Sequence, residues 1–279
     1  MNRKILVTGA SGQIGSEIIK LYKNTSHIIR GVSSSDLNIT NEKSVNIYMD
    51  DFKPDIIIHC AAYTSVDKAE IESDICYDVN ALGTKYLIKA SKNYNVKFLY
   101  LSSDYVFDGK LERPYDVDYE TKPINIYGKS KLEGELVVKE YSKKHFIVRT
   151  SWIFGNGRNF VNSMIKLAQS NSQIKVVNDQ IGSPTYSFDL AKLITIMVET
   201  DKYGTYHATN EEYCSWYDFA CEIFKIKDIK VDVIPILSEE YSSLAKRPKN
   251  SRLSKRSLIE NGFKLFPTWK DSLNLFLEN

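Results

Sequence analysis

Residues 8–15 read Thr8-Gly9-Ala10-Ser11-Gly12-Gln13-Ile14-Gly15, and this stretch decides the fold. It follows a short apolar run at residues 4–7, typical of a buried strand, and precedes residues 16–22, which have helical periodicity. Glycines spaced in this way let the backbone turn tightly and approach a pyrophosphate, which then sits on the N-terminus of the next helix. The place of the motif favours a dinucleotide site over a plain strand-to-helix turn.

The rest of the first half repeats this alternation of short apolar runs with longer amphipathic ones. Further strands are predicted at 27–32, 55–60, 97–101 and 146–150, and further helices at 44–52, 72–93 and 127–141. Strands separated by helices indicate an α/β fold, with a doubly wound parallel sheet covered on both faces.

The regular alternation of predicted strands and helices is lost after about residue 150. Helices are predicted at 162–168, 190–198 and 216–224, with strands at 174–177 and 230–234. We expect a dinucleotide-binding domain over 1–150 and a smaller, mainly substrate-binding α/β domain over 151–279. The boundary is soft because no composition shift marks a linker, so segments could cross back.

Composition excludes several classes of function. The 279-residue chain is 43% hydrophobic and 26% charged, which is typical of a globular protein, and its net charge of +2 argues against a nucleic-acid partner. No apolar stretch approaches the ~18 residues of a membrane span. The apolar run near the N-terminus is too short for the hydrophobic region of a secretory signal. Four cysteines without a CxxC pair and four scattered histidines predict a cytoplasmic protein with reduced thiols and no metal.

A second motif, Tyr127-Gly128-Lys129-Ser130-Lys131, opens a predicted helix. Residues four apart share one helix face, so the phenol of Tyr127 and the ammonium of Lys131 can meet the same ligand. A neighbouring cation stabilises the phenolate and brings the tyrosine pKa nearer neutrality, as proton transfer requires. The spacing alone is common on surface helices, but this one follows a strand that ends in hydroxyls.

That strand is followed by Ser102-Ser103-Asp104-Tyr105-Val106-Phe107-Asp108-Gly109. Polar residues at the carboxyl edge of a parallel sheet are where this architecture places its ligand. A serine hydroxyl there can bind and polarise a carbonyl oxygen. A plain Ser-Asp turn is the alternative for Ser102, but explains the whole cluster less well.

The cofactor type depends on the end of the second strand, Ile29-Arg30-Gly31-Val32-Ser33-Ser34-Ser35, where the first acid is Asp36. An acidic residue at the strand end normally binds the adenosine ribose and favours NAD. Serines and Arg30 could instead accept a 2′-phosphate, so NADPH is favoured and NADH stays open. The alternative is a surface arginine beside an ordinary loop.

Together these residues resemble the extended short-chain dehydrogenase/reductases, and within them the dTDP-4-dehydrorhamnose reductase family. The resemblance is collinear over nearly the full length, and rests on the strings at 8–15, 59–70, 102–109, 127–131, 149–152, 179–185 and 247–253. It implies a Rossmann-type fold and NAD(P)H-dependent reduction of the 4-keto group of a nucleotide-linked deoxysugar. The implied reaction converts dTDP-4-dehydro-L-rhamnose to dTDP-L-rhamnose, a precursor of cell-surface polysaccharide. A homodimer stays open.

The resemblance also implies residue roles. Tyr127 would donate the proton, Lys131 would be its electrostatic partner, and Ser103 would bind the reacting oxygen. Cofactor contacts would come from Gly9, Gly12, Gln13, Ile14, Gly15, Asn38, Ile39, Ala61, Ala62, Tyr63 and Thr64, besides Tyr127 and Lys131. The substrate would be bound by Ser103, Asp104, Trp152 and Arg247.

Some of these roles have plainer rivals. Asn38 stands where the family usually has an aspartate, which weakens the adenine contact. Trp152 could be core filling, while Arg247 and the less certain Arg252 could decorate a solvated loop. Asn80 could bridge backbone groups behind the site or be an ordinary helix residue.

Two other functions remain open on the sequence. One is a cofactor-binding regulatory subunit without catalysis, although an intact Ser103, Tyr127 and Lys131 argue against it. The other is epimerisation or dehydration of a nucleotide sugar. Dehydratases of the superfamily typically follow the hydroxyl residue with Asp-Glu, whereas Ser103 is followed here by Asp104 and Tyr105.

Overall fold

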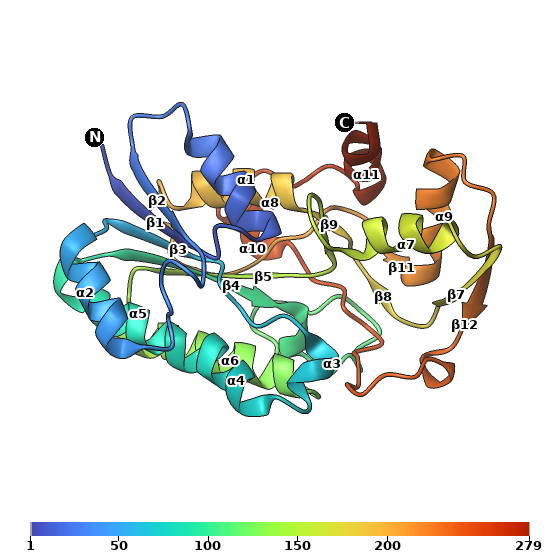
Figure 1. The fold of residues 1–279 in the computed structure, drawn as a ribbon, viewed down its shortest axis with the longest axis horizontal. Helices are drawn as coiled ribbons and strands as arrows, with labels where there is room; N and C mark the ends of the chain where they lie inside the picture. The colour runs from blue at the N-terminus through green and yellow to red at the C-terminus, as the bar shows by residue number, and fades with distance from the viewer. Residues whose placement is uncertain (1, 279) are drawn as a thin grey trace.

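A six-stranded parallel sheet runs through the computed structural model, which describes residues 2–278 (Figure 1). Its order is β10-β5-β4-β3-β1-β2. The strands are β1 (Lys4–Thr8), β2 (Ile28–Val32), β3 (Ile56–His59), β4 (Lys97–Ser103), β5 (His145–Thr150) and β10 (Gly204–His207). The order reverses between β1 and β3, and such a switch point opens a crevice at the carboxyl ends of the strands. The predicted Rossmann-type α/β fold is confirmed.

Helices cover both faces of this sheet. On one face α1 (Gln13–Tyr22) packs against α8 (Ser187–Met197), with α10 (Arg256–Glu260) nearby. On the other lie α2 (Glu42–Phe52), α5 (Gly83–Ser91) and α6 (Ile126–Tyr141), as Figure 1 shows. Because side chains alternate along a strand, Ile5 and Val7 face the first layer and Leu6 faces the second. A strand buried on both sides therefore reads as one continuous apolar run.

The segment between β3 and β4 is the least regular part of this half. It contains α3 (Val66–Ala69), α4 (Ser73–Tyr77), a π-helical turn η1 (Asp78–Leu82), α5 and a 3-10 turn η2 (Lys92–Tyr94). The helix predicted over 72–93 is therefore interrupted by a wide turn. Such turns often occur at functional sites.

The second half of the chain contributes to both parts of the molecule. Strand β10 pairs in parallel with β5, and α8 packs on α1, so this stretch completes the first sheet. The smaller layer contains α7 (Phe160–Ala168), β7 (Gln173–Val177), α9 (Trp216–Ile226), β12 (Asp232–Ile236) and α11 (Trp269–Glu278), drawn at one end in Figure 1. Short elements join the two parts: η3 (Asp104–Val106), β6 (Ile153–Phe154), β8 (Ile181–Gly182), β9 (Thr185–Tyr186), β11 (Cys214–Ser215) and η4 (Ser238–Glu240).

Residues 2–278 hold neither a membrane-spanning helix nor a cluster of metal ligands. No helix there is long and apolar enough to cross a membrane. In the same residues no three histidine, cysteine, aspartate or glutamate side chains are grouped so that they could hold a metal ion.

Candidate active site

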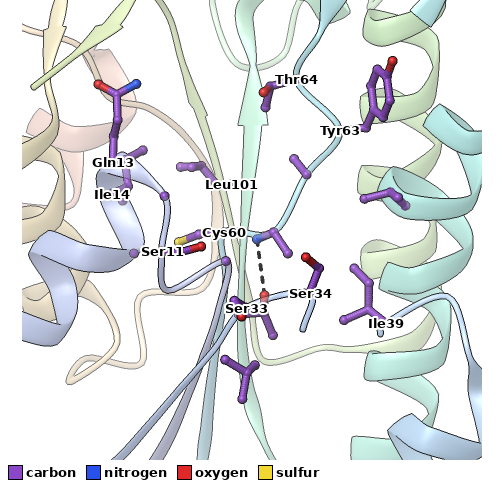
Figure 2. Close-up of a pocket in the computed structure, with 18 of the residues that line it drawn as sticks. Ser11, Gln13, Ile14, Ser33, Ser34, Ile39, Cys60, Tyr63, Thr64 and Leu101 are labelled. Carbon is purple, nitrogen blue, oxygen red and sulfur yellow. Dashed lines mark hydrogen bonds between the residues drawn. The ribbon is translucent and has the colours of Figure 1, made fainter. Parts of the chain in front are cut away.

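A cavity of about 610 Å³ lies at the carboxyl ends of β1, β3 and β4, a volume typical of small-molecule sites. Figure 2 shows Gln13 and Ile14 on one wall and Ile39 and Tyr63 on the opposite one. The residues whose cofactor contacts were implied by the family resemblance all line it: Gly9, Gly12, Gln13, Ile14, Gly15, Asn38, Ile39, Ala61, Ala62, Tyr63, Thr64, Tyr127 and Lys131.

The glycine-rich turn fits a dinucleotide for steric reasons. Gly9 has a φ of +67°, and a Cβ on it would lie 2.6 Å from the backbone nitrogen of Ala61. A Cβ on Gly15 would collide with the carbonyl oxygen of Gly9. Gly12 caps α1, so the first free N–H groups of that helix face the cavity. This cradle of backbone donors suits a pyrophosphate.

A buried histidine joins the strands beneath the cavity. His59 Nδ1 lies 2.6 Å from Thr8 Oγ1, and its Nε2 lies 3.0 Å from Thr84 Oγ1. The Ala61 N–H in turn donates to Thr8 Oγ1 at 3.3 Å. Burial lowers the pKa of His59 to about 3, so the ring is neutral and acts as a structural brace.

Asn80, in the π-helical turn, bridges backbone groups behind the site. Its Oδ1 accepts from the Tyr63 N–H at 2.8 Å, and its Nδ2 donates to the Tyr63 carbonyl at 3.1 Å. The same Nδ2 donates to Ser130 Oγ at 2.9 Å. Because Ser130 lies between Tyr127 and Lys131, Asn80 ties the cofactor-lining segment to the helix that carries both residues.

Tyr127 and Lys131 lie one turn apart on α6 and line the same cavity. Burial raises the pKa of Tyr127 above its usual value, and the nearby Ser103 hydroxyl partly offsets this. Burial lowers the pKa of Lys131 to about 7, with Glu135 acting in the opposite direction. The phenol therefore holds its proton at neutral pH, as a proton donor must. The expected lowering of the Tyr127 pKa toward neutrality is not found in the protein alone, because burial outweighs the neighbouring groups.

The two serines at the carboxyl end of β4, Ser102 and Ser103, make different contacts. Ser102 lines the cavity and donates to Glu135 Oε1 at 2.6 Å. Ser103 is buried beside Tyr127 and donates to Asp104 Oδ1 at 2.9 Å. Burial raises the pKa of the Asp104 carboxyl to about 6, and the Ser251 and Ser103 hydroxyls partly offset this. A buried carboxyl beside the Ser103 hydroxyl can accept a hydrogen bond from a ligand hydroxyl.

Sequence reasoning missed the ion pair below Lys131. Arg149 Nε and Nη2 donate to the two oxygens of Glu135 at 2.8 and 2.7 Å, and both side chains are buried. Glu135 follows Lys131 by one helical turn, so its negative charge lies on the side of the ammonium away from the cavity. The signal available in the sequence was a Glu four residues after Lys131 on the same helix face.

Two of the predicted substrate residues, Trp152 and Arg247, are not among the residues that line the first cavity. Trp152 stacks on Trp216 with ring centroids 3.7 Å apart, and is partly buried in the core of the smaller layer. Arg247 forms a two-pronged ion pair with Asp67, at 3.1 and 2.6 Å, and lines a second cavity of about 660 Å³. Arg252 is held by two partners: its Nε donates to Asn250 Oδ1 at 2.8 Å, and its Nη2 donates to the carbonyl oxygen of Glu112.

Two cofactor residues of the sequence analysis have other partners. Arg30 pairs with Asp51 at 2.6 Å and lies over the Phe52 ring, and it is not among the residues that line the cavity. The Asn38 side chain accepts from the backbone and hydroxyl of Thr40, although both residues do line the cavity. Arg30 is thus committed elsewhere, which removes the proposed cation for a 2′-phosphate.

The second half of the chain adds a wall that the sequence did not predict. Asn156, Gly157 and Arg158 line the first cavity from the loop between β6 and α7. Nothing in the local pattern points to this role, because it arises from a contact across more than half the chain.

Known proteins resemble this chain over its whole length. The family model described as the RmlD substrate binding domain matches residues 3–279. A dTDP-4-dehydrorhamnose reductase from Aggregatibacter actinomycetemcomitans is 42% identical, covering 97% of each chain. The spore coat polysaccharide biosynthesis protein SpsK of Bacillus subtilis is 38% identical, over 99% of this chain and 97% of that one.

A solved structure extends the match to the fold. The dTDP-4-dehydrorhamnose reductase of Bacillus anthracis, determined in complex with NADP, superposes with a TM-score of 0.97 at 43% identity, covering 100% of this chain and 99% of that one. The sequence motifs, the fold and the cavity agree with these matches. The chain belongs to the dTDP-4-dehydrorhamnose reductase family of the extended short-chain dehydrogenase/reductases.

Proposed function

We propose that this protein uses NADPH to reduce the 4-keto group of a nucleotide-linked deoxysugar, converting dTDP-4-dehydro-L-rhamnose to dTDP-L-rhamnose. The observation that carries the proposal is that Tyr127 and Lys131 line the same cavity as the glycine-rich turn. The names of the relatives support the substrate class, and the NADP complex of one of them supports the cofactor. NADH is a second donor to test.

The cofactor would lie along the first cavity. Its pyrophosphate would rest on Gly12, Gln13 and Ile14 at the start of α1, and its inner ribose and nicotinamide would pass Ala61 and Ala62 toward Tyr127. When bound, the nicotinamide supplies the hydride. The residues of the chain orient the two reactants and exclude water, which gives much of the rate by proximity.

The proton comes from the chain. Tyr127 donates its phenolic proton to the oxygen that forms at sugar C4, and Ser103 holds that oxygen by turning its hydroxyl from Asp104. The ammonium of Lys131 then offsets the phenolate charge. Glu135 favours the charged form of Lys131, so the buried ion pair with Arg149 supports the same step from behind.

The substrate would lie between the two parts of the molecule. Asp104 and Trp152 would contact the sugar, and Arg247 would bind the diphosphate after release from Asp67. This gives the second half of the chain a mainly substrate-binding role and the first half a mainly dinucleotide-binding one.

The test is to follow the absorbance of NADPH and NADH with dTDP-4-dehydro-L-rhamnose. A reductase consumes one reduced cofactor for each sugar, whereas epimerases and dehydratases regenerate theirs and a regulatory binder consumes none. Absence of stoichiometric consumption would reject the proposal. We also propose a cytoplasmic location, and a homodimer as the assembly to test by sedimentation velocity.

A further inference from the structure

The charged residues that line the first cavity are all positive. Among the residues that line it, the cations are Lys131 and Arg158, and none is an aspartate or glutamate. Lys131 lies one helical turn from Tyr127, and its ammonium is buried over the Tyr100 ring at 4.1 Å. A pyrophosphate bound on the first turn of α1 would therefore have one flexible cation left to meet, the guanidinium of Arg158.

The loop that carries Arg158 is anchored on the beginning of α1. Gln13 Nε2 donates to the carbonyl oxygen of Arg158 at 3.4 Å, and Asn159 Nδ2 donates to Gln13 Oε1 at 3.3 Å. One turn further on, Asn156 Nδ2 donates to Glu17 Oε1 at 3.1 Å. These bonds fix the backbone beside the helix N-terminus.

The side chain of Arg158, in contrast, is uncommitted. Within residues 2–278 its guanidinium has no hydrogen-bond or ion-pair partner, although its backbone is tied down. The other arginine considered for the cofactor, Arg30, is fixed by Asp51. An exposed arginine held at a cavity rim with free donors suits a phosphate, since its fork can bind two phosphate oxygens at once.

We infer that Arg158 binds the pyrophosphate of the dinucleotide and completes the glycine cradle from the second half of the chain. The inference rests on the proposed function for the identity of the ligand. It assigns the pyrophosphate rather than a 2′-phosphate because the loop follows β5 and β6 and contacts Gln13. Ser33 and Ser34 lie at the end of β2, which is separated from β5 by β4, β3 and β1.

The experiment measures cofactor binding without sugar. Dissociation constants for NADPH and for NADH are measured by fluorescence titration with the wild-type protein, Arg158→Gln and Arg30→Gln. We expect Arg158→Gln to weaken both cofactors by about tenfold, since one charge-assisted contact is lost. Arg30→Gln should stay within about twofold of the wild type, since it only breaks an exposed pair.

Salt gives a second readout on the same proteins. Added NaCl should weaken NADPH binding by the wild type more steeply than binding by Arg158→Gln, because the variant has lost a screened ionic contact. Arg158→Lys should recover part of the affinity, since it restores the charge without the fork.

Three results would overturn the inference: unchanged affinity in Arg158→Gln, weakening of NADPH but not NADH, or equal weakening in both arginine variants. Weakening of NADPH alone would mean that Arg158 contacts the 2′-phosphate. Equal weakening in both variants would mean that the net positive charge of the protein, and not a specific contact, attracts the cofactor. Failure of the wild type to bind either cofactor would overturn the proposed function as well. Normal binding with no sugar turnover would count against the reductase alone.

Discussion

The two cavities are built in opposite ways. The first is bordered by backbone groups and by Tyr127 and Lys131, and buried bonds from His59 and Asn80 hold its walls in place. In the second, the main cation, Arg247, is already paired within the protein. The proposed cofactor side is therefore formed in advance, whereas in the proposed substrate side Arg247 would have to leave Asp67 to bind a diphosphate.

The largest effect is expected from removing the proton donor in the first cavity. Tyr127→Phe should lower kcat by on the order of 10²–10⁴-fold, because the variant lacks the phenolic proton that the proposed reaction uses. NADPH affinity should change little, since the ring remains. Steady-state kinetics and a binding titration measure the two quantities. Near-normal turnover would mean that another group donates the proton.

The next largest effect is expected from breaking the buried ion pair between Glu135 and Arg149, below the first cavity. Glu135→Gln leaves the Arg149 charge buried without its partner, so we expect a loss of about 3–5 kcal/mol in the free energy of unfolding. Urea denaturation measures it. The control is Glu260→Gln, which breaks an exposed pair with Arg256 and should cost about 0–1 kcal/mol. Equal losses of unfolding free energy in the two variants would mean that the buried Glu135–Arg149 pair matters no more to stability than an exposed pair.

The charge of Lys131 predicts a pH dependence of the free enzyme. Its pKa is lowered to about 7, so the ammonium is lost as pH rises through that value. We expect kcat/KM for NADPH to fall across this range, since that parameter reports the unliganded protein. Glu135 raises the pKa of Lys131, so in Glu135→Gln the fall should begin at lower pH. A profile that is flat from pH 6 to 8 would contradict this.

The smallest effect tests the second cavity. Asp67→Asn should release Arg247 and lower KM for the nucleotide sugar by about two- to fivefold, because a half-buried ion pair that still meets solvent contributes only on the order of 1 kcal/mol. The matched control is Asp51→Asn, which frees Arg30 far from this cavity. A higher KM in Asp67→Asn would mean that Asp67 positions Arg247 instead of competing for it.

The same contrast explains how much the sequence could predict. The glycine turn and the Tyr127–Lys131 spacing are local, so the sheet, most of its helices and many residues that line the first cavity could be predicted from short strings. The interruption of the helix over 72–93 could not be predicted from the sequence. A π-helical turn adds one residue to a helical turn, and this changes the apolar periodicity too little to be recognised. Asn80 was left with two readings for that reason.

Contacts between distant segments could not be predicted. Arg30 was assigned to the cofactor because it lies near the end of the right strand, but the partner that holds it, Asp51, comes from the next helix. Arg158 and the pairing of Glu135 with Arg149 depend on how the second half folds back. A single sequence does not contain that geometry in any local pattern.

The return of the chain to its first sheet has a consequence for synthesis. Strand β10 follows the first elements of the smaller layer, so the edge of β5 remains open until residue 207 has been made. Unpaired strand edges are sites of aggregation, and pairing across such sequence distance slows folding. A fragment truncated at residue 150 would therefore keep the edge of β5 unpaired and prone to aggregation. The two halves should be expressed together.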